Sequence, residues 1–470
     1  MESAAKLAGS EPVPAVPSKA NTDQRAKSWL RSPLIAIPAP AKLAPVAYSI
    51  ADQALVVGAG FLVNIALART QTKEEYGMFT LSYSVLTFLT GLHNAAILEP
   101  YTVYGSGRYR DRFSEYLRLM LRSNAITGVL LSAILLSGCL LLSRIAPQFA
   151  PRALWGLGLT VSILLSGAFV RRVFYLQRQA ALAARTSLVF FMTVACGLWL
   201  AIKGQRLDSF SVFLILGLGW IAGAAAFGRK LALGNPKQDF VELEPRYWRE
   251  HWKYAKWVLA TASVFQLMNQ GYYWIVAGFL SVKEVAELKA TYLLIAPVEQ
   301  VVVSLSFLAL PILAANYAAK RVDAFLSQWK RYALAVLGVT TLFAFSVRIF
   351  GRLAIHTIYS GKFDDQSSLI ITLALVPMLM ALGNTMNDAL KAAEKPRFVF
   401  YAYLCSGAAT FLGGIPLVIH FGLRGAAYGM LLSAGTYTTA LAVGFSVAIS
   451  GNQKAIESLA DGELLSDRLS

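Results

Sequence analysis

Four carboxylate side chains lie within long apolar stretches of this sequence, and they are its first candidates for chemistry. These acidic residues are Asp52, Glu99, Glu299 and Asp388. A charge at bilayer depth costs at least about 2.5 kcal/mol on insertion scales, so an acid kept there is a candidate for coupling a cation or gating a pathway. The alternative for Glu299 is a protonated or hydrogen-bonded side chain that only packs, and for Asp52 a helix-entry cap facing the interface. Glu99 could tune the substrate or pair with a nearby Arg, and Asp388 could simply lie at the cytoplasmic interface. Glu299, two residues after Pro297, is the leading candidate for cation coupling.

The sequence lacks the patterns that a covalent or metal-dependent mechanism requires. It contains no Gly-rich phosphate loop, no HExxH motif and no convincing Ser, His and Asp set, and its three cysteines have no metal-ligand spacing. We therefore expect a protein that is not an enzyme, with no catalytic residue, no cofactor and no bound metal. Direct drive by ATP is not expected either.

The composition places the four acids in a membrane protein. Of 470 residues, 56% are hydrophobic and only 15% are charged, and the mean hydropathy is +0.53. A water-facing surface needs a more polar composition. The 43 Lys and Arg against 26 Asp and Glu could indicate nucleic-acid binding, but only on exposed polar surface. We interpret the basic excess as a topology signal and expect no nucleic-acid partner.

Twelve segments are long and apolar enough to cross the hydrocarbon, which takes about 20 helical residues. They are 43–68, 78–104, 120–142, 153–173, 183–202, 208–228, 257–282, 288–315, 332–350, 366–390, 398–421 and 425–449. The sequence thus predicts an all-α integral membrane protein with about twelve transmembrane helices. The predicted domains are a six-helix lobe at 43–228, a cytoplasmic linker with an interfacial helix at 229–256, and a second six-helix lobe at 257–449.

The distribution of Lys and Arg predicts the orientation of the chain. Basic residues are concentrated in every second connection between the predicted spans, which is the pattern of cytoplasmic loops. The segments 1–42 and 450–470 are therefore predicted cytoplasmic tails. The first is rich in Pro, Ala and Ser and is expected to be disordered.

The two halves of the chain share short sequence matches at a nearly constant offset. The matched segments are 73–75 with 283–285, 98–100 with 310–311, and 174–179 with 390–395. They indicate a six-plus-six duplication, with chance apolar similarity as the alternative. Six spans per repeat give both halves one orientation, so we expect a pseudo-two-fold axis along the membrane normal and a pathway between the lobes.

The first span and the last span carry motifs of a known family. Residues 51–79 contain Ala51-Asp52-Gln53, then Phe61-Leu62-Val63-Asn64, Ala68-Arg69 and Lys73-Glu74-Glu75-Tyr76-Gly77-Met78-Phe79, and residues 422–429 read Gly-Leu-Arg-Gly-Ala-Ala-Tyr-Gly. In this order the motifs resemble those of Wzx-type polysaccharide flippases of the multidrug/oligosaccharidyl-lipid/polysaccharide exporter superfamily. The resemblance extends over nearly the whole chain through its twelve spans and two lobes.

The resemblance implies a flippase that moves a polyprenyl-pyrophosphate-linked oligosaccharide from the cytoplasmic to the outer leaflet of a bacterial inner membrane. It implies alternating access, coupling to an H⁺ or Na⁺ gradient as in an antiporter, and a role in lipopolysaccharide or exopolysaccharide biosynthesis. The expected partners are the lipid-linked oligosaccharide, bilayer lipid and, as a candidate, a polysaccharide polymerase. A single chain with two lobes is expected to act as a monomer.

Within this resemblance, basic and amide side chains become candidate substrate ligands. Arg171, Arg172 and Arg178 at the end of the fourth span would hold the diphosphate, with anchoring at the membrane surface as the alternative. The amides that share one face of the seventh span would contact sugar hydroxyls, or else bond between helices; they are Gln266, Asn269 and Gln270. The deep charges are acidic, which departs from the cationic cavity that the family leads one to expect.

Two other functions compete with the flippase. A cation-coupled multidrug exporter of the same superfamily would use Asp52, Glu99 and Glu299 to bind organic cations. A polysaccharide-modifying membrane enzyme would need a long outer loop or a His-based acyl site, and the sequence has neither.

Overall fold

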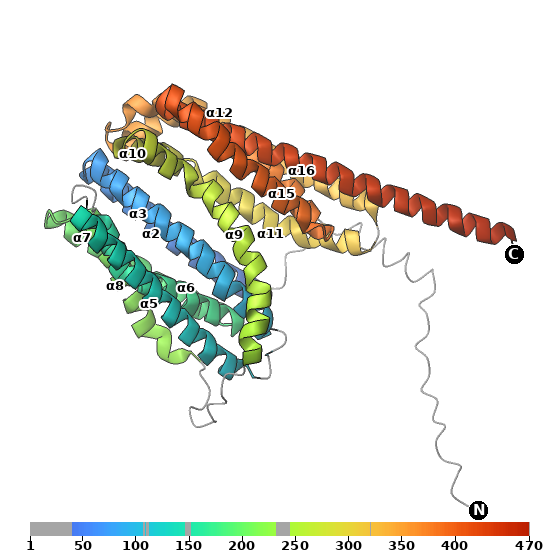
Figure 1. The fold of residues 1–470 in the computed structure, drawn as a ribbon, viewed down its shortest axis with the longest axis horizontal. Helices are drawn as coiled ribbons and strands as arrows, with labels where there is room; N and C mark the ends of the chain where they lie inside the picture. Colours follow the sequence, from blue (N-terminus) through green and yellow to red (C-terminus); the bar gives the residue numbers. More distant parts are fainter. Residues whose placement is uncertain are drawn as a thin grey trace, which may run out of the picture.

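The computed structural model describes residues 40–106, 109, 112–145, 152–231, 245–319 and 321–469, with side chains described for 44–105, 109, 112–145, 152–231, 249–319 and 321–448. All regular structure in these ranges is helical (Figure 1). The prediction of an all-α membrane protein is confirmed. The predicted tail 1–42 falls outside the described residues except for the start of the first helix.

The described part of the N-terminal lobe is built from helices. Its elements are α2 (Pro40–Thr70), α3 (Lys73–His93), the π-helix η1 (Asn94–Leu98), α4 (Glu99–Ser106), α5 (Phe113–Ile145), α6 (Arg152–Leu176), α7 (Ala180–Lys203), α8 (Ser209–Phe227) and the short η3 (Gly228–Lys230). Polar caps fix the starts of two of them: Thr72 Oγ1 accepts the Glu75 N–H of α3, and Asp208 and Ser211 form a reciprocal capping box on α8.

The C-terminal lobe is also helical and has more interruptions. Its elements are α9 (Pro245–Phe279), α10 (Val282–Leu293), α11 (Ala296–Ala318), α12 (Val322–Tyr359), η4 (Asp364–Gln366), α13 (Ser367–Leu373), α14 (Leu375–Ala392), α15 (Pro396–Ala408), the π-helix η5 (Ala409–Gly413) and α16 (Gly414–Leu469). Gly422, with φ of 60°, reverses the chain within α16, so residues after it pack back on α15. Ser406 Oγ accordingly donates to the Ser433 carbonyl at 2.9 Å.

Ten helical stretches in the described residues are long and apolar enough to cross a membrane. The longest, Pro396–Ala448, includes the reversal at Gly422, and α9 is not among the ten. The predicted count of twelve therefore stays a prediction, as does the two-fold axis.

One turn recurs in both lobes at positions that the sequence repeat pairs. Arg178, between α6 and α7, and Glu394, between α14 and α15, each have φ of 57°. The residue after each turn, Gln179 or Lys395, donates its N–H five residues back, to Phe174 or Leu390. The same left-handed residue closes the same helix end in both halves, which agrees with a duplication.

Three boundaries differ from the sequence expectation. The predicted interfacial helix in 229–256 is the first part of the continuous helix α9. The helix starts at Pro245, and neither Pro nor Gly interrupts it before Gly271. The predicted span 288–315 is broken after Leu293, since Pro297 lacks the N–H that a continuing helix would use. The predicted tail 450–470 continues α16 as far as Leu469.

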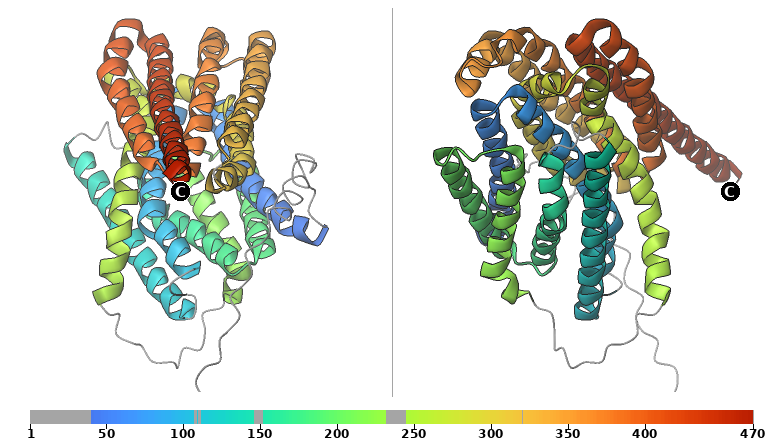
Figure 2. Two further views of the ribbon diagram at one scale, coloured as in Figure 1. Left: turned by 90° about the vertical axis from the view of Figure 1, so that its right-hand side faces the viewer. Right: turned by 60° about the vertical axis from the view of Figure 1, so that its left-hand side comes forward.

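The two lobes lie close together at the end where α10 lies and spread apart toward their other ends (Figure 1). Across the boundary, α3 packs against α9 and α10. Figure 2 shows how α9 links the lobes: His251 Nε2 contacts the Ala96 carbonyl of the N-terminal lobe at 2.7 Å, whereas Tyr272 Oη contacts Ser433 Oγ of the C-terminal lobe at 2.9 Å. Each lobe also has a buried apolar cluster of its own, around Tyr101 and Phe169 in the first and around Leu390 and Tyr437 in the second.

Candidate functional site

The lobes are joined directly at the α10 end, which we call the closed end. Lys73 Nζ of α3 donates to Glu287 Oε1 of α10 at 2.7 Å, and the two side chains are only 16% and 9% exposed. Gln366 Nε2 donates to the other carboxylate oxygen of Glu287 at 3.0 Å. Water and salt screen such a pair less than a surface pair, and the loss of either partner would leave the other charge buried without its counter-charge.

Aromatic and backbone contacts reinforce the closed end. Lys73 Nζ lies 5.2 Å from the centre of the Phe363 ring, and the Tyr76 ring packs edge-on against the same ring. Arg69 Nη2 of α2 donates to the Thr357 carbonyl of α12 at 2.9 Å. Burial and the neighbouring Lys73 charge lower the pKa of Lys362, which lies in the turn after α12. This turn is therefore crowded with positive charge.

A basic residue that sequence reasoning did not single out lies at the junction of α3, α9 and α10, which we call the inter-lobe junction. Lys289 Nζ of α10 is 5.8 Å from the ring centre of Tyr83 on α3 and 5.6 Å from that of Tyr273 on α9. Both distances suit cation–π attraction. Lys289 stands at the edge of the predicted span 288–315, where a lysine normally anchors a helix at the interface, so the sequence gave little signal for it.

Glu299 lies beside Lys289, at the start of α11 and not in the middle of a helix. Its Oε1 accepts a hydrogen bond from Tyr292 Oη, one turn after Lys289 on α10. Glu299 and Lys289 attract each other electrostatically, but no direct hydrogen bond joins these two described side chains. The first turn of a helix favours a carboxylate, because the free N–H groups there carry partial positive charge.

The predicted amide ligands lie on α9 near the same junction. Gln266 packs so closely on Gly91 of α3 that an added Cβ there would lie 2.0 Å from its Nε2. Asn269 Nδ2 donates to the Phe265 carbonyl of its own helix at 2.9 Å, and Gln270 is partly exposed. One turn further, Trp274 Nε1 donates to Ser84 Oγ of α3 at 2.7 Å, so this face of α9 bonds between the lobes.

Asp52 is enclosed within the N-terminal lobe. Its side chain is 1% exposed and accepts hydrogen bonds from Arg171 Nη2 at 2.6 Å, Tyr175 Oη at 2.6 Å and Ser187 Oγ. Arg171 Nε adds a second contact at 3.0 Å. The predicted diphosphate ligand Arg171 and the predicted coupling acid Asp52 therefore form one buried ion pair.

The other predicted residues of this lobe lie near that pair or at its edge. Arg172 Nη2 donates to Asn94 Oδ1 of η1 at 3.1 Å and is attracted by Glu99. Glu99 Oε1 in turn accepts from Tyr254 Oη of α9 at 3.1 Å. Arg178 is exposed in its turn, two residues before α7 begins at Ala180. The sequence-predicted arginines and acids of this lobe thus neutralise one another in part.

Asp388 is confined to the C-terminal lobe, away from the junction. It is 6% exposed and accepts from Ser306 Oγ of α11 and, at 2.9 Å, from Tyr332 Oη of α12. It therefore joins three helices of one lobe. In the described residues, no group of three or more His, Cys, Asp or Glu side chains could hold a metal ion.

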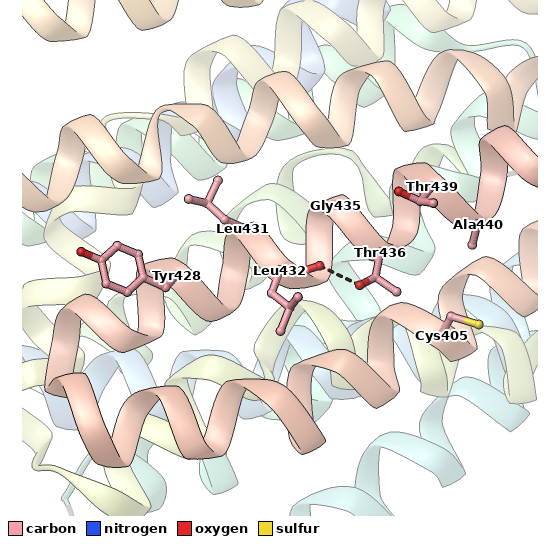
Figure 3. A pocket seen from close by; sticks show the side chains of 8 residues that line it. All are labelled: Cys405, Tyr428, Leu431, Leu432, Gly435, Thr436, Thr439 and Ala440. Carbon is pink, nitrogen blue, oxygen red and sulfur yellow. Dashed lines mark hydrogen bonds between the residues drawn. The ribbon is translucent and has the colours of Figure 1, made fainter.

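A groove of about 770 Å³ lies on the C-terminal lobe between α15 and the second leg of α16 (Figure 3). Its lining is mostly apolar and consists of Cys405, Tyr428, Leu431, Leu432, Gly435, Thr436, Thr439 and Ala440. The Thr436 hydroxyl donates to the Leu432 carbonyl at 2.8 Å and is not free for a ligand. The groove suits hydrocarbon and offers nothing to hold a charged group.

The fold, with its two lobes meeting at one end, is that of known membrane transporters. No family model and no curated protein sequence matches the chain. Among solved structures, it is similar to an inward-facing multidrug resistance MATE family transporter of the MOP superfamily, with a TM-score of 0.72 and 14% identity over 86% of this chain and 96% of that one. The outward-facing form of a MATE family transporter gives a TM-score of 0.62 at 12% identity, covering 87% and 96%.

A lipid flippase has the same fold. The lipid II flippase MurJ, in an inward closed conformation, matches with a TM-score of 0.67 and 14% identity over 88% of this chain and 93% of that one. At these identities the likeness establishes the fold. The chain therefore shares its fold with these two solved membrane proteins, in agreement with the ten apolar helical stretches among its described residues.

Proposed function

We propose that this protein is a flippase for a polyprenyl-diphosphate-linked oligosaccharide, which it moves from the cytoplasmic to the outer leaflet for surface or exopolysaccharide biosynthesis. The fold supports a transporter, since a multidrug transporter and a lipid flippase share it. In the proposal the lobes rock so that the closed end opens as the opposite end closes, and no covalent chemistry takes place. Such a carrier is needed because each unpaired polar group costs roughly 2–7 kcal/mol in hydrocarbon.

The observation that carries this substrate class is Lys289. It supplies a positive charge at the boundary of the lobes, where alternating access requires the substrate to bind. A diphosphate needs such a charge, and a cationic drug is repelled by it. The sequence-level objection, that all deep charges are acidic, is answered by this residue.

The predicted ligands take supporting roles in the proposal. Gln266, Asn269 and Gln270 would contact sugar hydroxyls along α9. Arg172 would meet the diphosphate where the lobes spread apart, with Arg171 held in place by Asp52 and Arg178 behind them. Because α2 ends at the closed end with Arg69, the predicted cytoplasmic start of the chain puts the opposite end of the lobes toward the cytoplasm. Coupling to H⁺ or Na⁺ through Glu299, action as a monomer, and a polysaccharide polymerase as partner belong to the same proposal.

A cation-coupled multidrug exporter is the second candidate. The observation that favours it is that Glu299 bonds to Tyr292 at a junction that Tyr83 and Tyr273 also line, since an acid near aromatic rings suits an organic cation.

The sidedness of the lipid-linked oligosaccharide separates the two functions. Membranes with and without the protein would be probed with an impermeant sugar-specific reagent from the outer side. The flippase proposal requires repeat units trapped on the cytoplasmic leaflet in its absence and returned to the outer leaflet by the protein. Unchanged sidedness, combined with efflux of an organic cation such as ethidium, would establish the exporter instead.

A further inference from the structure

We infer that the outward face of the first part of α9 is a binding surface for anionic phospholipid head groups, in the leaflet at the end opposite the closed end. The inference concerns a second ligand surface, and it does not depend on which substrate the protein carries.

Aromatic and basic side chains lie together along one exposed face of this helix, which we call the α9 stripe. Their spacings of three and four residues place them on one side of the helix. The stripe consists of Arg249, Trp252, Lys253, Lys256 and Trp257, all of which are exposed. Trp252 is 58% and Trp257 71% exposed, and Lys256 Nζ lies 5.7 Å from the centre of the Trp257 ring. The surface thus offers apolar contact and positive charge side by side.

The positive charges of the α9 stripe have no counter-charge within the described residues. None of the ion pairs there involves Arg249, Lys253 or Lys256. Glu250, the one acid in the segment 249–257, is turned toward the N-terminal lobe, where its Oε2 accepts from Tyr109 Oη at 2.8 Å. Three charges on one face therefore remain for a partner with negative charge.

The opposite face of the same segment packs on the N-terminal lobe, so the stripe points away from the protein. Ala255 is fully buried, and His251 Nε2 contacts the Ala96 carbonyl. Tyr254 Oη donates to Glu99 Oε1 at 3.1 Å. In both views of Figure 2 the start of α9 lies at the edge of the helix bundle. The stripe is therefore open to the surroundings on the helix that links the two lobes.

The position along α9 places the stripe at the membrane surface, which selects lipid as the partner. Trp257 begins the predicted span 257–282, which contains no Asp, Glu, Lys or Arg. Arg249 and Lys256 are about 10 Å apart along the helix axis, against roughly 5–8 Å for one head-group layer. Trp and basic residues are enriched in this layer. Each basic side chain near an anionic surface strengthens the attraction roughly fivefold.

Quenching of tryptophan fluorescence by brominated lipid tests the inference on the full-length protein in phosphatidylcholine vesicles. Brominated phosphatidylglycerol or brominated phosphatidylcholine is included at the same fraction. The signal of the stripe is the difference between wild type and the double variant Trp252→Phe, Trp257→Phe. The association constant from this signal should be at least about fivefold larger for phosphatidylglycerol. This preference should fall as salt is raised, because ions screen exposed charges.

Matched variants separate the basic charges of the stripe from other causes. Arg249→Gln with Lys253→Gln and Lys256→Gln should remove the preference. Arg249→Lys with Lys253→Arg and Lys256→Arg keeps the charge and should keep the preference. Thermal unfolding in detergent checks that both triple variants fold, and the salt series on wild type tests the charges without any basic substitution.

A second tryptophan controls for the net positive charge of the whole protein. Trp199 lies at the end of α7 on the closed-end side, with Lys203 Nζ 6.0 Å from its ring centre. Its signal, isolated with Trp199→Phe, should show a smaller preference than the stripe. An equal preference at Trp199 would overturn the inference. So would equal quenching of the stripe by both lipids, no quenching by either, or a preference that persists at high salt or in the triple Gln variant.

Discussion

Asp52 and Glu299 are two acids of the same kind in two different surroundings. Asp52 lies inside one lobe, and its carboxylate accepts hydrogen bonds from an arginine, a tyrosine and a serine. Glu299 lies at a helix break on the boundary between lobes and has one tyrosine hydroxyl and a cation at a distance. A buried acid whose bonds are all made stabilises one arrangement. An acid with unused bonding capacity at the boundary between the lobes is free to take a further partner.

The arginine partner explains why Asp52 should matter first for folding. Asp52→Asn leaves the Arg171 guanidinium buried without its counter-charge, and breaking such a pair costs about 3–5 kcal/mol. We expect this variant to lose most of its folded population, measured by thermal unfolding in detergent. Asp52→Leu combined with Arg171→Met should regain stability. An Asp52→Asn protein that is stable but does not transport would instead indicate that Asp52 couples the cation. Asp52 and Glu299 would then have the same role.

Lys289 should show the opposite behaviour. Lys289→Gln removes a charge that lies over two tyrosine rings and forms no ion pair within the described residues, so folding is expected to change little. Removing one side of a buried charge contact to the substrate costs about 2–5 kcal/mol, or roughly 30- to 5,000-fold in transport rate. Lys289→Arg keeps the charge and should retain part of the activity. Equal loss in both variants would indicate a steric role.

The closed end offers a smaller, conformational effect. Lys73→Glu or Glu287→Lys places like charges together and should move the lobes apart at this end, seen as a longer distance between spin labels on the two lobes. The double exchange restores opposite charges and should return the distance toward that of wild type. If the single and double variants give the same spin-label distance as wild type, the ion pair does not hold the lobes together.

Lys362 should produce the smallest effect. The pKa of Lys362 is lowered at the closed end, so Lys362 is protonated to a smaller extent when the lobes are in contact than when they are apart. Stability of the closed end therefore rises as the pH increases through the lowered pKa of Lys362 toward the ordinary lysine value. Lys362→Gln should remove this rise in the same spin-label measurement, and a rise that persists in the variant would assign it to another group.

The sequence predicts an all-α membrane protein because a helix that crosses the bilayer needs a long apolar stretch, which is visible in its own residues. It also pairs residues 174–179 with 390–395, whose turns prove to share one backbone conformation. It could not show that Arg171 and Asp52, 119 positions apart, form one ion pair, because that contact depends on how α2 and α6 pack. Nor could it distinguish Lys289 from an interfacial anchor, since this depends on the ring positions of two other helices.

The central claim is that Lys289 carries a diphosphate-linked head group between the leaflets. The direct measurement uses vesicles reconstituted with the purified protein and a polyprenyl-diphosphate oligosaccharide, in which an impermeant reagent reports the fraction that has changed leaflet. The account predicts rapid exchange with wild type, exchange near the protein-free rate with Lys289→Gln, and partial recovery with Lys289→Arg. Wild-type vesicles that exchange the lipid no faster than protein-free vesicles, or a Lys289→Gln protein as fast as wild type, would contradict it.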